Sequence, residues 1–321
     1  MHIRRILTAA AVGAMFAPVH AHAQHMNPVI DLLAAKKPVF GLYAPANRRV
    51  RPGQPAPPVD SVKTAAQLAA DAVAYKTQDY VFDGTMEGNF DNAFGPFSEF
   101  AKGMSAAGML QGKKLTHPLY VKTPEIAPDP AKANERISRQ LNLGVSGIVF
   151  VGVESADEVT KGLAMMRFKS KGGTRPDDVG DAPARWGLSE KDYKEKADVW
   201  PLNPEGELVN FTIVESKEGL AHVREIAAVK GIGVLLPGAG TLRQVFSTTD
   251  ANGQRTLDTN AWEAAIQQVL AACKEFNVPC GYPATATDIE MRMKQGFSVF
   301  VIGWGEPGFK TVDIGRSIGK R

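Results

Sequence analysis

The sequence predicts an α/β fold in which one domain forms a (β/α)8 TIM barrel. Eight short runs rich in β-branched and aromatic residues alternate with eight helical stretches. A strand followed by a helix, repeated eight times, is the signature of a closed parallel barrel. The 321 residues, 44% of them hydrophobic and 22% charged, suit one such barrel of roughly 250 residues with insertions. The same composition excludes a disordered or collagen-like chain and a small disulfide-rich protein.

The predicted strands are short apolar runs bounded by turn residues. In order they cover residues 39–43, 80–82, 119–121, 147–151, 210–214, 234–236, 280–282 and 299–302.

The predicted helices lie between these strands, where apolar residues recur at helical spacing. They cover residues 61–76, 94–107, 131–143, 156–168, 217–229, 261–276, 287–295 and 310–318. Residues with N-capping side chains precede two helices, and glycines follow three others: Asp60 or Ser61, Thr259 or Asn260, then Gly144, Gly231 and Gly296.

Residues 1–23 have the pattern of a cleavable export signal. Two arginines at positions 4 and 5 precede an apolar run over 6–19, and Ala21-His22-Ala23 provides an A-x-A cleavage site. The arginine pair also resembles a twin-arginine signal. The alternative to a cleavable signal is that these residues stay on the protein as an uncleaved anchor. We expect a periplasmic or secreted protein whose single domain covers 24–321. No later apolar run is long enough for a membrane span.

The charge and the cysteines restrict the partners further. Without the first 23 residues the chain carries 35 basic and 34 acidic residues, so no nucleic-acid partner is implied. The only cysteines, Cys273 and Cys280, could form a disulfide in an exported protein or remain two buried thiols.

The histidines argue against two common chemistries. Only His25, His117 and His222 remain after the signal, in unrelated segments. A three-histidine zinc site would need all three, and a serine triad lacks a G-x-S-x-G elbow here.

In a barrel the active site forms from the loops at the carboxyl ends of the strands. The loop over 44–60 carries Arg48, Arg49 and Arg51, which either form a solvated insertion or attract an anionic substrate. The long polar segment over 170–208 suggests a lid or a subunit contact.

Several blocks in the second half of the chain carry a family resemblance. Leu143-Gly144-Val145-Ser146-Gly147-Ile148-Val149-Phe150-Val151 is followed by Glu154-Ser155-Ala156-Asp157-Glu158, then by Gly173-Thr174-Arg175, Ala184-Arg185-Trp186, Asp192-Tyr193, Ile213-Val214-Glu215-Ser216 and the segment 226–232. In order and spacing they resemble the HpcH/HpaI aldolase/citrate lyase family over residues 39–302.

The resemblance implies a phosphoenolpyruvate/pyruvate-type barrel lyase that makes or breaks a carbon-carbon bond beside a carbonyl. In such enzymes a Mg²⁺ or Mn²⁺ ion, held by a Glu and an Asp, stabilises the enolate. The metal Glu falls on Glu215 and the Asp on Thr241, while the conserved arginine falls on Lys122. The proton-transferring histidine has no counterpart, although Asp83 and Glu87 remain nearby.

These departures have chemical consequences. Thr for Asp removes a charged oxygen ligand, and Lys for Arg keeps the charge without the bidentate fork. We therefore expect Lys122, Glu87 and Asp83 to act in catalysis and Glu215 to hold a metal if one binds. For substrate binding we name Thr241, Arg175 and Trp304. The alternative roles are pinning a turn for Arg175 and packing for Trp304.

Three functions remain open at this point. The first is an exported aldolase-type lyase acting on a small oxo or hydroxy acid, and the others are a metal-free altered lyase and a non-catalytic binding barrel. We also expect a homo-oligomer, because the last segment, 306–321, leaves room for about three turns of weak helix. So short a helix would leave barrel surface uncovered unless a partner or the segment 26–35 packs there.

Overall fold

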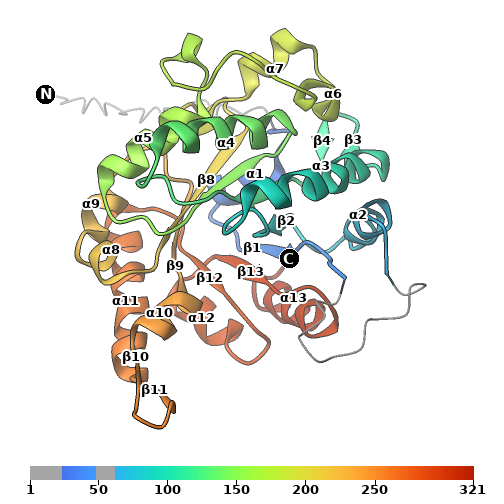
Figure 1. The fold of residues 1–321 in the computed structure, drawn as a ribbon. Coiled ribbons are helices and arrows are strands. Elements are labelled where there is room, and N and C mark those ends of the chain that lie inside the picture. The colour runs from blue at the N-terminus through green and yellow to red at the C-terminus, as the bar shows by residue number, and fades with distance from the viewer. Residues whose placement is uncertain (1–23, 48–61) are drawn as a thin grey trace, which may run out of the picture.

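The computed structural model describes residues 24–47 and 62–321 and shows an eight-stranded parallel barrel (Figure 1). Neighbouring strands pair in the order β12-β13-β1-β2-β5-β6-β8-β9, and a bridge between Leu235 and Cys280 joins β9 to β12. The predicted fold class is therefore confirmed. The strands are β1 (Val39–Tyr43), β2 (Tyr80–Asp83), β5 (Leu119–Lys122), β6 (Gly147–Phe150), β8 (Leu208–Val214), β9 (Val234–Pro237), β12 (Gly281–Pro283) and β13 (Val299–Ile302).

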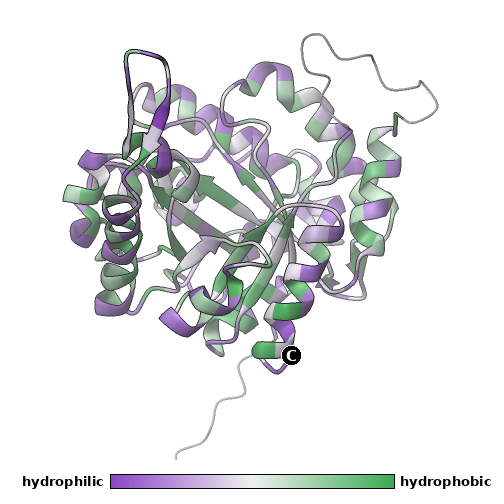
Figure 2. Cartoon of the chain, turned by 90° about the horizontal axis from the view of Figure 1, so that it is seen from below, coloured by the Kyte–Doolittle hydropathy of each residue, from purple (hydrophilic) through white to green (hydrophobic). Residues whose placement is uncertain are grey.

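Helices cover the outside of the barrel, with their hydrophilic faces turned to solvent (Figure 2). They are α2 (Ala65–Ala74), α3 (Phe90–Ala106), α4 (Pro130–Asn142), α5 (Ala156–Met166), α8 (Lys217–Ala221), α9 (Val223–Ala227), α10 (Ala239–Val245), α11 (Thr259–Phe276), α12 (Ile289–Gln295) and α13 (Glu306–Ile318).

The helix boundaries differ from the predicted ones at the caps. The N-cap of α11 is Asp258, whose side chain accepts the N–H of Ala261, and α2 begins after Thr64 in a capping box with Gln67. The N-caps expected at Asp60 or Ser61 lie outside the described residues. The glycines expected after α4, α9 and α12 do have positive φ, as helix ends require: Gly144, Gly231 and Gly296.

The inside of the barrel is filled by aromatic and branched side chains. Tyr80, Tyr120 and Phe211 meet there, with ring centroids 4.8–5.7 Å apart. Their bulk requires glycines on neighbouring strands, because a Cβ at Gly41 would lie 2.1 Å from a Tyr80 ring carbon and one at Gly147 would lie 2.2 Å from a Tyr120 ring carbon. The interior is thus a packed core and not a pore.

Helix α1 (Pro28–Ala34) closes the amino-terminal end of the barrel. Its Val29, Ile30 and Leu33 belong to the same buried cluster as the interior strand residues. Glu207, just before β8, accepts the backbone N–H groups of Met26 and Asn27 at 3.0 and 2.9 Å. The N-terminal segment therefore plugs the base of the barrel and does not cover a gap beside the last helix.

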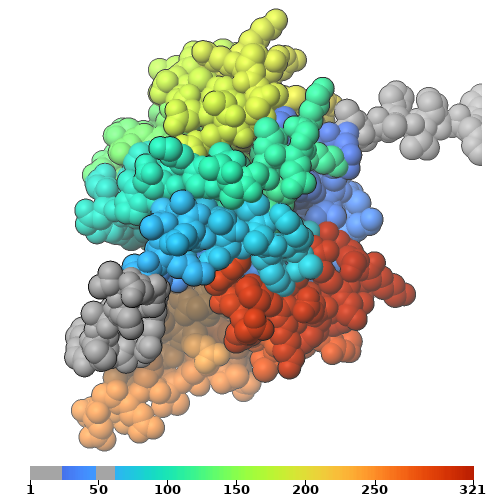
Figure 3. All heavy atoms as spheres, turned by 90° about the vertical axis from the view of Figure 1, so that its right-hand side faces the viewer, coloured from blue at the N-terminus to red at the C-terminus, as the bar shows by residue number. Residues whose placement is uncertain are grey.

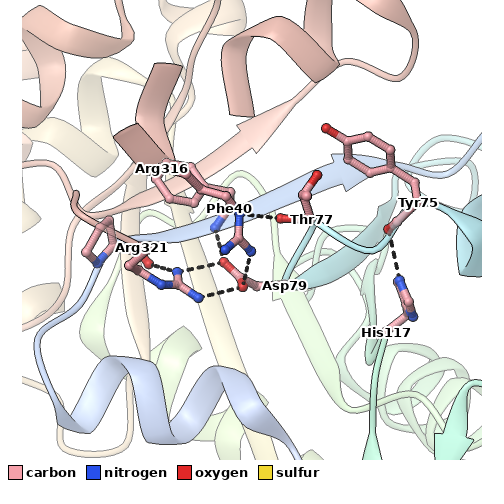
Figure 4. Close-up of polar contacts among 8 residues, drawn as sticks. Phe40, Tyr75, Thr77, Asp79, His117, Arg316 and Arg321 are labelled. Atoms are coloured by element: carbon pink, nitrogen blue, oxygen red, sulfur yellow. Dashed lines mark hydrogen bonds and ion pairs between the residues drawn. The ribbon is translucent and has the colours of Figure 1, made fainter. Parts of the chain in front are cut away.

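The last helix is longer than predicted, because α13 begins at Glu306 and not at residue 310. In Figure 3 it lies beside α2, which separates it from α3. Figure 4 shows how its end is held: Arg316 and Arg321 both reach Asp79, at 2.9 and 2.8 Å. With 13 residues α13 is still a short helix of about three and a half turns, as the argument for an oligomer assumed. The oligomeric state itself stays a prediction.

The long segment between α5 and β8 folds at the base of the barrel. It forms the short helix η2 (Lys169–Lys171), α6 (Ala182–Trp186), α7 (Glu190–Lys196) and β7 (Val199–Trp200), and β7 pairs with the first residues of β8. Since the segment connects the end of a helix to the start of a strand, it lies away from the carboxyl ends of the strands. The lid expected over 170–208 is therefore wrong.

Two small antiparallel ribbons complete the fold. They are β3 (Leu110–Gln111) with β4 (Lys114–Leu115), and β10 (Ser247–Thr249) with β11 (Arg255–Leu257).

Cys273 and Cys280 form a disulfide. The sequence had left open whether they form a disulfide or remain two buried thiols.

Candidate active site

Lys122 and Glu87 form an ion pair at the carboxyl ends of β5 and β2. The Lys122 Nζ donates to both Glu87 carboxylate oxygens, at 2.9 and 2.8 Å. The lysine side chain is 14% exposed and the glutamate 38%, so the pair is reachable from the mouth of the barrel. The Gln140 amide donates to the Lys122 carbonyl at 2.9 Å and fixes the end of the strand. Two of the three residues that the sequence predicted for catalysis, Lys122 and Glu87, are thus in direct contact.

Asp83 ends β2 and is buried beside this pair. Its Oδ1 accepts the backbone N–H and the hydroxyl of Thr85, at 2.9 and 2.5 Å. Burial raises the pKa of the Asp83 carboxyl, although the two hydrogen bonds from Thr85 act in the opposite direction. A carboxyl group with a raised pKa can hold and release a proton closer to neutral pH.

Tyr43, at the end of β1, lies among the carboxylates of the mouth. Burial raises the pKa of its hydroxyl to about 12, and the negative charges of Glu87, Asp83 and Glu215 add to the effect. Its ring packs edge-on against Phe82, with centroids 4.9 Å apart. The hydroxyl is therefore a hydrogen-bond donor at neutral pH and not a base.

Glu215 follows β8 directly, where the barrel rule places a functional carboxylate. Its Oε1 accepts the backbone N–H of Gly152, at the end of β6, at 3.0 Å. A Cβ at Gly238, after β9, would lie 2.4 Å from the Glu215 Cβ, so only glycine fits there. These backbone neighbours, which no sequence pattern had singled out, fix the direction of the carboxylate.

A cleft of about 510 Å³ opens beside these groups, between the ends of β1 and β2 and helices α2 and α3. Tyr43, Asp83 and Glu87 line its polar side, and Phe97 and Phe100 of α3 line its apolar side. The size is within the range of small-molecule sites. The three arginines expected near this loop, at 48, 49 and 51, lie outside the described residues.

Arg175 does not reach the mouth. It follows α5, at the base, and is fully buried, with its guanidinium donating to Asn142 at 2.9 Å and stacking over Phe168 at 4.2 Å. Of the two roles considered, substrate binding is therefore wrong and the residue pins the turn. The sequence signal that separates these roles is position, because Arg175 follows a predicted helix and precedes a strand, which places it at the base of a barrel.

Trp304 and Thr241 follow β13 and β9, at the expected end of the barrel. Trp304 packs against Tyr75 and Phe309, with ring centroids 6.1 and 5.1 Å away, and does not line the cleft beside Asp83. These contacts correspond to the packing role that was the alternative for Trp304. Thr241 lies exposed in the first turns of α10, and its substrate-binding role stays a prediction.

The residues at the mouth do not fit the metal site that the resemblance implies. Glu215 already accepts a backbone N–H with one oxygen, and Thr241 supplies at most a neutral hydroxyl. In the described part of the chain, no group of three or more His, Cys, Asp or Glu side chains is placed to hold an ion. Hard divalent cations prefer several charged oxygen ligands, so we assign no step to a metal.

No helix of the described residues is long and apolar enough to cross a membrane. The sequence itself finds no match among curated proteins.

Solved structures with the same fold are distant in sequence. An HpcH/HpaI aldolase/citrate lyase family protein from Burkholderia cenocepacia J2315 is 19% identical, with a TM-score of 0.64 over 92% of this chain and 97% of that one. An HpcH/HpaI aldolase from Desulfitobacterium hafniense DCB-2 is 15% identical, with a TM-score of 0.59 over 90% and 95%. Macrophomate synthase is 16% identical, with a TM-score of 0.59 over 91% and 87%. At these identities the likeness concerns the fold alone.

The sequence model of one family covers more than half of the chain. The HpcH/HpaI aldolase/citrate lyase model matches residues 110–303, which include β5 with Lys122, β8 with Glu215 and the strands up to β13. The chain belongs to the HpcH/HpaI aldolase/citrate lyase family.

Proposed function

We propose that this protein is an aldolase-type lyase that cleaves or forms a carbon-carbon bond in a small oxo or hydroxy acid. The observation that carries the proposal is the Lys122–Glu87 ion pair beside the buried Asp83, at the ends of adjacent strands. A cation and two carboxyl groups at one barrel mouth are what such a reaction needs: a site for the developing negative charge and groups that move protons.

The proposed cleavage assigns each group one task. Glu87 accepts the proton of the substrate hydroxyl as its carbon-carbon bond breaks and a carbonyl forms at that carbon. The bonding electrons move into the oxo acid and give an enolate, whose oxygen accepts hydrogen bonds from the Lys122 ammonium group. Asp83 enters the cycle protonated in this scheme and gives its proton to the enolate carbon. The aldehyde and the oxo acid leave, and the proton count is restored when Asp83 recovers the proton held by Glu87.

Lys122 would stabilise the enolate by charge alone. A lysine ammonium is a compact cation with three donors, so it can exchange its two Glu87 contacts for substrate oxygens. Because this role needs no metal, we propose activity that persists in EDTA. Glu215 would orient the substrate from the opposite side of the mouth.

The substrate is proposed to combine a carboxylate with an apolar part. Phe97 and Phe100 line one wall of the cleft, where burial of apolar surface contributes to binding. We also keep export to the periplasm or outside, from residues 1–23, and a homo-oligomeric state as proposals.

The test is a retro-aldol and condensation assay with pyruvate and a panel of aldehydes, with and without Mg²⁺, Mn²⁺ and EDTA. We expect turnover that EDTA does not abolish and that falls about 100-fold or more in Lys122→Met, from loss of the charge on the enolate. Lys161→Met is the matched control, because Lys161 is an exposed lysine in an ion pair with Asp157 on α5.

Two outcomes would count against the proposal, the first against its metal-free step and the second against catalysis itself. Activity that appears only with a divalent ion would show that the metal chemistry of the family is retained. Ligand-induced stabilisation without turnover of any panel member would instead support a non-catalytic binding barrel.

A further inference from the structure

A second cavity lies at the base of the barrel, on the face opposite the proposed active site. It has a volume of about 690 Å³ and is bordered by the starts of β9, β12 and β13 and by the ends of α1, α9 and α11. The volume is within the range of about 300–1,000 Å³ typical of small-molecule sites. The mechanism proposed above uses no residue of this cavity.

Four lysines surround the cavity: Lys36, Lys37, Lys230 and Lys274. All four are exposed, and no aspartate or glutamate is among the lining residues. In the described ranges the lysines that pair with carboxylates are others, at positions 63, 122, 161, 194 and 294. The cavity is therefore ringed by positive charge without a counter-ion from the described part of the protein.

One of the lysines is hydrogen-bonded to the cavity wall, and a second lies over a glycine of that wall. The Lys36 ammonium donates to the Asn277 side chain at 3.2 Å. Lys274 extends over Gly296, where an added Cβ would lie 3.0 Å from the lysine Cε and 3.5 Å from its Nζ. Ordered lysines lose less side-chain entropy when they bind a ligand than free ones do.

Helix ends explain part of this pattern. Lysines near the last turns of α1, α9 and α11 complement the partial negative charge of the helix carboxyl ends. That complement requires no cavity, however, and each helix would be satisfied by a lysine facing bulk water. What the helix ends do not explain is that the four ammonium groups gather around one hollow with an apolar wall.

The wall of the cavity is apolar and partly aromatic. Trp200 and Phe276 line it together with Leu33, Ile232 and Leu270, and Leu202 beside it is 43% exposed. Inorganic anions gain nothing from such a surface, whereas an organic anion can bury a flat apolar body against it. The positive charge and the apolar wall together favour an organic anion with an apolar body.

We propose that this cavity binds a small organic carboxylate with an aromatic or aliphatic body, its carboxylate held by Lys36 and Lys274. The site is separate from the lyase mouth, so the proposal does not depend on the proposed function. The experiment that tests this site measures ligand binding and not turnover.

The experiment uses isothermal titration of the purified protein with 2-naphthoate, with the neutral 2-naphthamide and with inorganic phosphate. We expect saturable binding of naphthoate, weaker binding of the amide, and no competition by equimolar phosphate. The double variant K36Q/K274Q should bind naphthoate about tenfold less tightly, because each removed charge contributes a modest exposed interaction. High salt should weaken the binding in the same direction.

The matched control is K191Q/K310Q, which changes the net charge equally at two exposed lysines outside the cavity. It should bind naphthoate like the unmodified protein. Equal weakening in the control would show a non-specific field effect, and equal affinity for the amide would show a merely apolar groove. Either result, or no binding at millimolar naphthoate, overturns the proposal.

Discussion

Replacing Asp79 by asparagine should destabilise the barrel more than the loss of any surface ion pair. Asp79 precedes β2 at the base and is buried, with 8% of its residue surface exposed. It accepts the backbone N–H of Phe40 at 2.8 Å and guanidinium donors of Arg316 and Arg321 at 2.9 and 2.8 Å (Figure 4). One carboxylate thus connects β1, β2 and the C-terminal helix.

The expected loss of stability follows from how deeply the Asp79 carboxylate and the two arginine side chains are buried. Breaking a fully buried ion pair costs about 3–5 kcal/mol. The two arginine side chains are 21% and 15% exposed and keep backbone carbonyl partners at Thr77 and Pro38, so part of their charge stays solvated. We therefore expect Asp79→Asn to lower the free energy of unfolding by about 2–3 kcal/mol, or about 4–6 °C in Tm at roughly 2 °C per kcal/mol for a chain of this size.

Thermal and urea unfolding of the variant, measured by circular dichroism, test this value. Glu190→Gln is the matched control, because it removes the carboxylate of an exposed i,i+4 pair with Lys194 and should cost less than about 0.5 kcal/mol. A double-mutant cycle with Arg321→Met isolates the pair itself. A change below about 0.5 kcal/mol for Asp79→Asn, equal to the control, would refute the view that this network secures α13.

Three further predictions concern pH and packing. The hydrogen bond that the His25 ring donates to the Glu207 carboxylate is the largest of the effects that raise the pKa of His25. The stability that this contact contributes is complete below the unfolded pKa of about 6.5 and is lost as pH rises through the folded value, so His25→Gln should flatten this dependence in unfolding measured from pH 5 to 9. Burial raises the pKa of the Asp83 carboxyl, so ionisation of this group opposes folding as pH rises. Asp83→Asn should therefore raise Tm at pH 7 while lowering lyase activity. An unchanged or lower Tm would contradict this prediction. Gly147→Ala should cost about 1–3 kcal/mol by overpacking, since the new Cβ would lie 2.2 Å from a tyrosine ring carbon, whereas Gly88→Ala, with nothing within 4 Å, serves as its control in the same denaturation assay.

The strands were predictable because their periodicity is local. The runs at 39–43 and 299–302 match β1 and β13 to the residue, since buried parallel strands are continuous apolar stretches between turns. The start of α13 was missed because Gly305, Pro307 and Gly308 lower helix propensity. In the fold Pro307 lies in the first turn, where proline is tolerated, and Gly308 packs against the Gly303 carbonyl, where a Cβ would lie 1.7 Å from the oxygen.

The site was only partly predictable, because side-chain contacts across strands are not local. Glu87 and Lys122 are 35 residues apart, yet the parallel register of β2 and β5 brings their ends together, so the barrel rule placed them correctly. The substrate-binding role predicted for Arg175 goes against the same rule, since a residue after a helix belongs to the base of the barrel and not to the mouth. Counting which side of each βα unit a residue occupies would have separated the two cases.

Among the described residues, carboxylates lie near Lys122 at the mouth and lysines line the cavity at the base, and this bears on how the chain could handle an acidic substrate. At the mouth, burial is the main cause that raises the pKa of the Tyr43 hydroxyl to about 12, and nearby carboxylates, Glu87 among them, add to it. Lys122 therefore lies in negatively charged surroundings. An anionic substrate gains little from binding there until its own charge meets the lysine, and the interaction strengthens as the enolate oxygen becomes negative. A cation whose contacts are stronger in the transition state than in the ground state contributes to turnover and not merely to affinity. The ring of lysines at the base has no such acidic surroundings, so it favours ground-state binding of an anion, as the inference of a separate ligand site requires.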